Sequence, residues 1–240
     1  MLTVVTSFSP GGYEQYGQRF VETFRQFWPA SVRLICAWEG VGPLGLDGFD
    51  LLGSVKFKSF LERHKYNPVI AGLKEGQQRW SPKSKLKGYS FRHDALKFSR
   101  KVFAIAQVAK YVQGGKLFWI DADVRTHSPV PERLLHAVLP DDVSLCYLKR
   151  EGYHSELGFT GYNLDRDEAR QFIGAYQWLY SSDEFLDLPY WDDCNVFDWL
   201  IEQTKPVVKC IHHTSQPQPF DNSILATCMT HKKGKRKEAA

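Results

Sequence analysis

The sequence predicts a single α/β domain in which a mostly parallel central sheet is flanked by helices. Near the amino terminus, a β-rich segment, a glycine-containing turn, a helical segment and a second β-rich segment follow one another. Later, a long helical segment leads directly into an apolar strand. A chain of 240 residues is long enough for one well-cored domain and short for two.

The first elements are indicated by residue type and spacing. Leu2–Phe8 is rich in β-branched and aromatic residues and runs into the turn Ser9-Pro10-Gly11-Gly12. From Glu14, aromatic residues recur at helical spacing until Pro29, which predicts a helix. Residues 32–38 then predict a second buried strand.

The rest of the chain continues the alternation after an irregular segment. Residues 40–90 are interrupted by Gly and Pro and predict short helices and loops, whereas residues 91–112 have a strong helical period that ends at Gly114-Gly115. Residues 116–124 predict an apolar strand. Further strands are expected at 143–148 and 158–162, and further helices at 167–179 and 196–202.

Composition excludes several classes of protein. Hydrophobic residues make up 43% and charged residues 24%, which excludes a wholly disordered chain. No apolar run approaches the roughly 20 residues of a membrane-spanning helix, and the first residues lack the features of a secretory signal. Five widely spaced cysteines without a Cys-x-x-Cys pair argue against a disulfide framework and a zinc knuckle. We expect a cytoplasmic protein, bacterial or viral in a host cytoplasm.

Charge is distributed unevenly along the chain. The formal net charge is +4, yet residues 56–101 hold 13 Lys and Arg against 3 Asp and Glu, and the last ten residues hold 5 against 1. Aromatic residues are interleaved with the basic residues of 56–101. This pattern is typical of a face that binds a polyanion, although a solvated charged loop has the same composition.

Two carboxylates at the end of an apolar strand are the sharpest chemical signal. Asp121 and Asp123 follow Phe118–Ile120 and are separated by one residue. Because side chains two apart on a strand point the same way, both carboxylates can face one ion. Oxygen ligands suit Mg²⁺ or Mn²⁺, and open α/β sheets bind ligands at the carboxyl ends of their strands. The alternative is a turn followed by a helix cap.

This stretch, Leu-Phe-Trp-Ile-Asp-Ala-Asp-Val after a long helix, resembles the Asp-x-Asp region of the GT-A-fold glycosyltransferases, whose domain is Rossmann-related. The resemblance implies a metal-dependent enzyme that uses a nucleotide-diphosphate sugar, with UDP-sugars favoured. It implies a nucleotide-sugar-binding half over residues 1–130, an acceptor half over 131–230 and a basic tail over 231–240. Leu2–Pro10 is similar to the family's first nucleotide-binding strand, and Glu156–Asn163 is similar to its strand near the sugar and acceptor.

The resemblance also implies roles for individual residues. Asp121 is expected near the ribose and the metal, Asp123 on the metal, and His231 as a third metal ligand, unless His231 is only part of a basic tail. The residues expected to contact the nucleotide sugar at the first strand are Thr6, Ser7, Phe8 and Ser9. Lys233 and Arg236 would neutralise the leaving diphosphate, unless the tail is solubilising or binds nucleic acid.

Arg92 and Lys101 are candidate contacts for the diphosphate or sugar. Nine residues on a straight helix turn through a net 180°, so the two side chains cannot face one phosphate unless the helix begins after Arg92. We favour a helix that begins after Arg92. The alternative for this basic cluster is a solvated helix face.

Trp191-Asp192-Asp193 is the candidate catalytic group. A carboxylate is needed to deprotonate an acceptor hydroxyl in an inverting transferase, and Trp191 could stack on a sugar ring. Glu156 is a reserve base. The alternative is that Asp192 or Asp193 caps the helix that follows.

These observations predict a glycosyltransferase acting on a hydroxyl acceptor, with retention or inversion left open. The acceptor is DNA, such as hydroxymethylated bases of viral DNA, or a saccharide, lipid-linked or protein acceptor. The competing hypotheses are a sugar-phosphate nucleotidyltransferase and a non-catalytic nucleic-acid-binding module. The first is disfavoured because the turn after the first strand holds no basic residue before Arg19.

Overall fold

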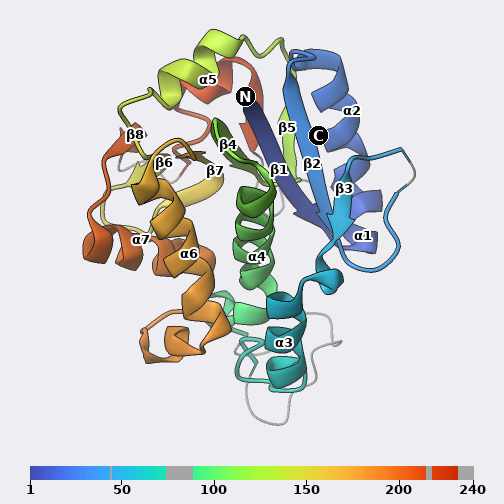
Figure 1. The fold of residues 1–240 in the computed structure, drawn as a ribbon, viewed down its shortest axis with the longest axis vertical. Coiled ribbons are helices and arrows are strands. Elements are labelled where there is room, and N and C mark those ends of the chain that lie inside the picture. The colour runs from blue at the N-terminus through green and yellow to red at the C-terminus, as the bar shows by residue number, and fades with distance from the viewer. Residues whose placement is uncertain (44, 74–88, 215–217, 232–240) are drawn as a thin grey trace.

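The structure is a computed structural model that describes residues 1–43, 45–73, 89–214 and 218–231 (Figure 1). Its centre is a seven-stranded sheet. In sheet order the strands are β3 (Gly48–Asp50), β2 (Val32–Trp38), β1 (Leu2–Phe8), β4 (Lys116–Ile120), β7 (Glu156–Asn163), β6 (Leu145–Arg150) and β8 (Val208–Thr214).

Strand direction decides which ends of the strands meet. Strands β3, β2, β1 and β4 are mutually parallel, whereas β7 is antiparallel to both β4 and β6. Strand β8 is parallel to β6. The amino end of β7 therefore lies beside the carboxyl end of β4, at the edge of the sheet where β1 also ends and where open α/β sheets bind their ligands.

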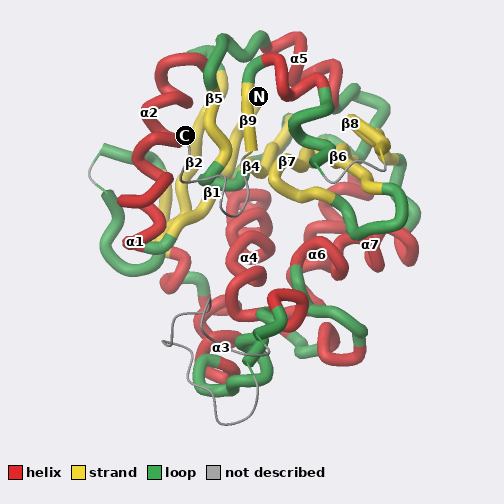
Figure 2. The backbone as a smooth tube through the Cα atoms, turned by 180° about the vertical axis from the view of Figure 1, so that it is seen from behind, coloured by secondary structure: helices red, strands yellow, loops and turns green. Residues whose placement is uncertain are grey.

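Helices cover both faces of the sheet (Figures 1 and 2). One core contains residues of α2 (Gln18–Phe27) and α5 (Glu132–Val138). The other contains residues of α3 (Val55–His64), α4 (Ala95–Tyr111), α6 (Asp167–Ser181) and α7 (Asp193–Thr204). The strands alternate between the two cores: Leu117 and Trp119 face the α4 side, and Phe118 and Ile120 face the α2 side.

A short antiparallel ribbon joins distant parts of the chain. β5 (Val124–Thr126) pairs with β9 (Met229–His231), so that Val124 lies opposite His231. The ribbon follows directly from the turn that holds Asp121 and Asp123. It therefore brings His231 beside these two acids.

The predicted fold class is confirmed, and several boundaries differ. The first helix begins earlier than Glu14, because α1 (Pro10–Gly12) and a π-helical turn (Tyr13–Gly17) lead into α2. The predicted helix 91–112 is a short 3₁₀ turn followed by α4, whose first turn is capped by the Asp94 carboxylate accepting from the backbone N–H of Lys97 at 3.1 Å. The helix thus begins after Arg92, as the sequence favoured.

Residues 116–124 do not form one continuous strand. β4 ends at Ile120, and a turn at 121–123, closed by the Val124 N–H donating to the Asp121 carbonyl at 2.9 Å, separates it from β5. The expected strand alternation of Asp121 and Asp123 is wrong for this reason. In the irregular segment, α3 is one of the short helices expected there, whereas β3 was not predicted, because three residues are too few to show a strand period.

Two further features are plain. Among the described residues, no helix combines the length and the apolar character needed to cross a bilayer. The five cysteines are unpaired thiols, of which Cys36, Cys146 and Cys228 are buried.

Candidate active site

A cavity of about 750 Å³ opens at the carboxyl ends of β1, β2 and β4. The start of α4 and the start of α7 form its other walls. Its lining includes Ser7, Phe8, Ser9, Tyr16, Trp38, Glu39, Arg100, Lys101, Trp119, Asp121, Asp123, His154, Asp192, Asp193, Cys194 and His231.

Asp121, Asp123 and His231 converge on one wall of this cavity. His231 Nε2 lies 3.0 Å from Asp123 Oδ1 and 3.8 Å from Asp121 Oδ2. Asp121 is also held from within β4, since the Trp119 indole N–H donates to its Oδ1 at 2.7 Å. The turn and the β5–β9 ribbon, rather than strand alternation, bring the three side chains together.

The His231 ring is tightly enclosed by neighbouring residues. Its side chain is 2% exposed, and its Nδ1 lies 3.4 Å from Glu156 Oε1, which itself accepts the Gly158 N–H at 3.0 Å. A Cβ at position 158 would come within 2.3 Å of His231 Nδ1, so only glycine leaves room for the ring. Glu156, 2% exposed, therefore lies behind His231 rather than in the cavity.

The protein groups around His231 favour its charged form. Burial alone would lower the pKa of the imidazole, but hydrogen bonds with Asp123 and Glu156, and the charges of Asp123 and Asp121, raise it to about 9. The same negative surroundings suit a divalent cation in place of the proton.

Asp121, Asp123 and His231 fit a metal ion. One ligand atom from each lies within 4.8 Å of the others. Two carboxylates and one imidazole form a set of oxygen and nitrogen donors that Mn²⁺ accepts readily, whereas Mg²⁺ prefers oxygen alone. The Glu156 carboxylate behind His231 matches the carboxylate that commonly orients a metal-binding histidine.

Lys101 links the two acidic sides of the cavity. Its Nζ lies 3.0 Å from Asp121 Oδ1 and 2.5 Å from Asp193 Oδ2, and it donates to the Leu157 carbonyl at 2.9 Å. Burial alone would lower the pKa of Lys101, but the carboxylates of Asp121 and Asp193 raise it well above its ordinary value. Lys101 therefore lines the cavity with its charge already paired.

Asp192 and Asp193 stand at the amino end of α7 and are each 1% exposed. Asp192 caps the helix: its Oδ1 accepts from the N–H groups of Cys194 and Asn195, and its Oδ2 accepts from the Asn195 amide at 2.6 Å. Burial, and then the neighbouring Asp193 charge, raise the pKa of Asp192. Asp192 thus combines the capping role with a place in the cavity wall.

The remaining predicted nucleotide-sugar contacts divide into four groups. Ser7, Phe8 and Ser9 line the cavity, whereas Thr6 is fully buried in β1. Arg92 instead lies over the Tyr190 ring, 4.6 Å from its centroid, and lines a neighbouring cavity. Lys233 and Arg236 fall outside the described residues.

Several lining residues were not identified from the sequence. Trp38 ends β2 and Glu39 follows it, and both could have been found, because the carboxyl end of a second parallel strand lies at the same edge of the sheet. Glu39 accepts from two of the three guanidinium nitrogens of Arg100, Nε at 2.5 Å and Nη2 at 3.0 Å. Tyr16 lies in the π-helical turn, and burial, with the charges of Asp123 and Asp121, raises its pKa; no local pattern marks it.

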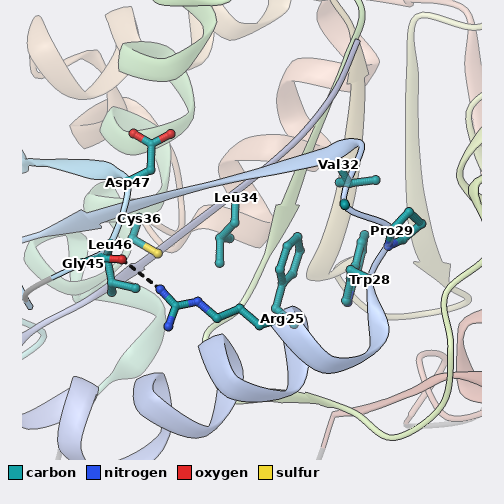
Figure 3. A pocket seen from close by; sticks show the side chains of 11 residues that line it. Arg25, Trp28, Pro29, Val32, Leu34, Cys36, Gly45, Leu46 and Asp47 are labelled. Carbon is teal, nitrogen blue, oxygen red and sulfur yellow. Dashed lines mark hydrogen bonds between the residues drawn. The ribbon is translucent and has the colours of Figure 1, made fainter.

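Two other hollows border the sheet. One, of about 650 Å³, shares His154 with the main cavity and is lined by residues that include Arg92, Tyr147, Lys149, Tyr153 and Glu202. The other, of about 390 Å³, lies between α2 and β2 and is lined by Phe24, Trp28 and Leu34 among others; there the Arg25 guanidinium donates to the Gly45 carbonyl (Figure 3). Of these two hollows, only the first shares a lining residue with the main cavity.

No protein-family model matches this chain, and no curated protein matches its sequence. Solved structures do match its fold. Mouse xyloside xylosyltransferase 1 matches with a TM-score of 0.51 at 10% identity, over 88% of this chain and 85% of that one. A glycosyltransferase involved in glycosylation of the major capsid of PBCV-1 matches with a TM-score of 0.51 at 12% identity, over 100% and 99% of the two chains.

An active-site mutant of LgtC also matches, with a TM-score of 0.51 at 14% identity, over 88% of this chain and 73% of that one. These likenesses show that the chain has the GT-A fold of glycosyltransferases, the fold that the Asp-x-Asp resemblance implied.

Proposed function

We propose that this protein is a metal-dependent glycosyltransferase that moves a sugar from a nucleoside-diphosphate sugar to a hydroxyl group. One observation carries the proposal: Asp121, Asp123 and His231 form a metal-ligand group on the wall of a cavity of about 750 Å³, at the strand ends where this fold binds ligands. A uridine diphosphate sugar is the first donor to test, because the resemblance favours it.

The donor side of the cavity is built around β1 and β4. We place the nucleotide against Ser7, Phe8 and Ser9, and the diphosphate beside Asp121, Asp123 and His231. A divalent cation held by these three residues would neutralise charge on the departing diphosphate. Lys233 and Arg236 remain proposed diphosphate contacts.

Lys101 is proposed as a positioning residue rather than a diphosphate contact. Its ammonium group already faces Asp121, Asp193 and the Leu157 carbonyl. By pairing with both acids at once, it fixes the distance between the donor side and the start of α7. Because these three contacts all lie within the protein, we do not expect this ammonium group to contact a substrate directly.

The carboxylate pair Asp192 and Asp193 is proposed to face the reacting sugar from the α7 side. In an inverting reaction one of them takes the proton of the acceptor hydroxyl, and in a retaining reaction the pair stabilises positive charge at the anomeric carbon. We do not propose Glu156 as a base, because its carboxylate lies behind His231. The anomeric configuration of the product decides between the two roles.

We favour a saccharide acceptor over DNA. The hollow that shares His154 with the main cavity has aromatic rings and hydrogen-bonding groups in its wall, among them Tyr153 and Glu202, as sugar sites do. The basic segment 56–101 is also partly neutralised within the protein, since Arg63 pairs with Asp183 and Arg100 with Glu39. DNA remains the second acceptor class to assay.

The experiment is a thermal-shift screen of nucleoside-diphosphate sugars with and without Mn²⁺, followed by product analysis with sugar and DNA acceptors. Wild-type protein should be stabilised by one donor only when Mn²⁺ is present. Asp123→Asn should lose at least about tenfold in Mn²⁺ affinity and lose donor binding, while its circular dichroism is unchanged.

Asp142→Asn is the matched control, because Asp142 is an exposed residue in a turn away from the cavity. It should bind Mn²⁺ and donor as wild type does. Unchanged turnover in Asp123→Asn would remove the metal argument. Tight, salt-sensitive DNA binding without donor hydrolysis or transfer would favour the nucleic-acid-binding module instead.

A further inference from the structure

A second cluster of metal-binding side chains lies on the wall of the same cavity. His154, in the segment between β6 and β7, faces Asp192 and Cys194 at the start of α7. One ligand atom from each of the three lies within 4.8 Å of the others. This cluster shares no residue with the Asp121, Asp123 and His231 group.

Asp192 is a buried carboxylate without a counter-ion. It is 1% exposed, and its hydrogen-bond donors are neutral: the N–H groups of the first turn of α7 and the Asn195 amide. Among the described residues, no Lys, Arg or His nitrogen forms an ion pair with it, whereas its neighbour Asp193 has Lys101. Burying an uncompensated charge is costly, so a cation bound here would be stabilised.

His154 is oriented from its Nδ1 side. Nδ1 lies 3.2 Å from the Ser155 carbonyl oxygen, and Ser155 is itself fixed by Asp198, which accepts from the Ser155 N–H at 2.7 Å and hydroxyl at 2.5 Å. Arg150 Nη2 lies 2.7 Å from Nδ1, and because a guanidinium only donates, Nδ1 accepts from it and Nε2 carries the proton in this arrangement. Metal ligation through Nε2 therefore requires Nδ1 to take the proton and donate to the Ser155 carbonyl, with Arg150 Nη2 turned to that carbonyl, which it already approaches at 3.3 Å.

We propose that His154, Asp192 and Cys194 form a binding site for Zn²⁺. One nitrogen, one oxygen and one sulfur donor suit this borderline-soft cation and disfavour Mg²⁺ and Mn²⁺, which do not select thiolate ligands. Ligand atoms around a tetrahedral Zn²⁺ lie about 3.3–3.7 Å apart, so atoms now separated by as much as 4.8 Å would close by at most about 1.5 Å through side-chain rotation.

Binding of Zn²⁺ at this site releases one proton. The Cys194 thiol gives its proton to solvent as its sulfur bonds to Zn²⁺, and no electron is transferred. Burial, and then the charge of Asp193, raise the pKa of the Cys194 thiol, so the thiolate forms only as the cation binds and displaces the proton.

A consequence of this site rests on the proposed function. Asp192 belongs to the carboxylate pair proposed to face the reacting sugar, so Zn²⁺ bound to it would inhibit transfer. The protein would then carry two metal sites of opposite effect in one cavity: an oxygen-rich site that supports the reaction and a sulfur-containing site that stops it.

The test uses Co²⁺ as a spectroscopic substitute for Zn²⁺ on the full-length protein. One equivalent of Co²⁺ should produce a thiolate-to-cobalt charge-transfer band that Zn²⁺ abolishes. The band should persist in Asp123→Asn, which removes the other site, and vanish in Cys194→Ser. His154→Gln should weaken Co²⁺ binding at least about tenfold, so that the conclusion does not depend on one variant.

Cys210→Ser is the matched control, because Cys210 is the exposed thiol among the described cysteines and the natural place for adventitious binding. Absence of the band in wild type, or a band that vanishes in Cys210→Ser and survives in Cys194→Ser, would overturn the site. These spectroscopic measurements need no turnover, so their outcome does not depend on whether the protein transfers sugar. Zn²⁺ inhibition that is lost in Cys194→Ser would support the consequence, and equal inhibition of both proteins would overturn it.

Discussion

Replacing Lys101 by Met tests whether this lysine holds the cavity together. The change keeps an unbranched chain of similar length and removes the charge. Asp193, whose side chain is 2% exposed, would lose its cation at 2.5 Å, and Asp121 would lose one at 3.0 Å. Removing one partner of a buried ion pair costs about 3–5 kcal/mol, because the remaining charge is left uncompensated. For a domain of this size the melting temperature should fall by at least about 6 °C.

The assay is urea unfolding of wild type and variant at pH 7, monitored by circular dichroism. Asp193→Asn introduced into Lys101→Met should recover most of the lost stability, since the amide is close in shape and carries no charge.

Arg33→Met is the matched control. Arg33 pairs with Asp47 at 2.7 Å, but both side chains are about half exposed, at 51% and 53%. Exposed pairs contribute about 0–1 kcal/mol, so this variant should be nearly as stable as wild type. Equal losses in Lys101→Met and Arg33→Met, or no recovery in the double variant, would refute the reasoning.

Three further predictions concern His231 and the basic tail. In metal-free buffer, the stabilisation from charged His231 should be complete below pH 6.5 and lost as pH rises through about 9, so the stability difference between wild type and His231→Asn should shrink by up to about 3 kcal/mol over this window in urea titrations. Gly158→Ala should displace the His231 ring and weaken Mn²⁺ binding by calorimetry, whereas Gly174→Ala, where a Cβ meets nothing within 4 Å, should leave it unchanged. Replacing residues 232–240 with a neutral Gly/Ser segment should weaken donor binding by titration calorimetry, because positive charge beside the diphosphate is lost; wild-type affinity in that variant would exclude a role for the tail.

Much of the fold was predictable because its signals are local. The strand residues Val32–Trp38 and the helical period of α4 can each be recognised within a short window of sequence. The same is true of the Asp121 and Asp123 pair, since an apolar strand that ends in two acids identifies the ligand-binding edge of an α/β sheet. The helix cap at Asp192 was also readable, as one of two open alternatives.

The sequence by itself therefore determined the α/β class, the central helix and strand, and the acids at the strand end. Only the tertiary structure decided what surrounds those acids. His231 reaches Asp123 through a ribbon whose strands are about a hundred residues apart, and Lys101 meets Asp193 because α4 and α7 pack on the same face of the sheet. Spacing along the chain cannot reveal such pairs. Ion pairing and metal ligation depend on distances in space, and these distances are set only by the order in which the strands pair in the sheet.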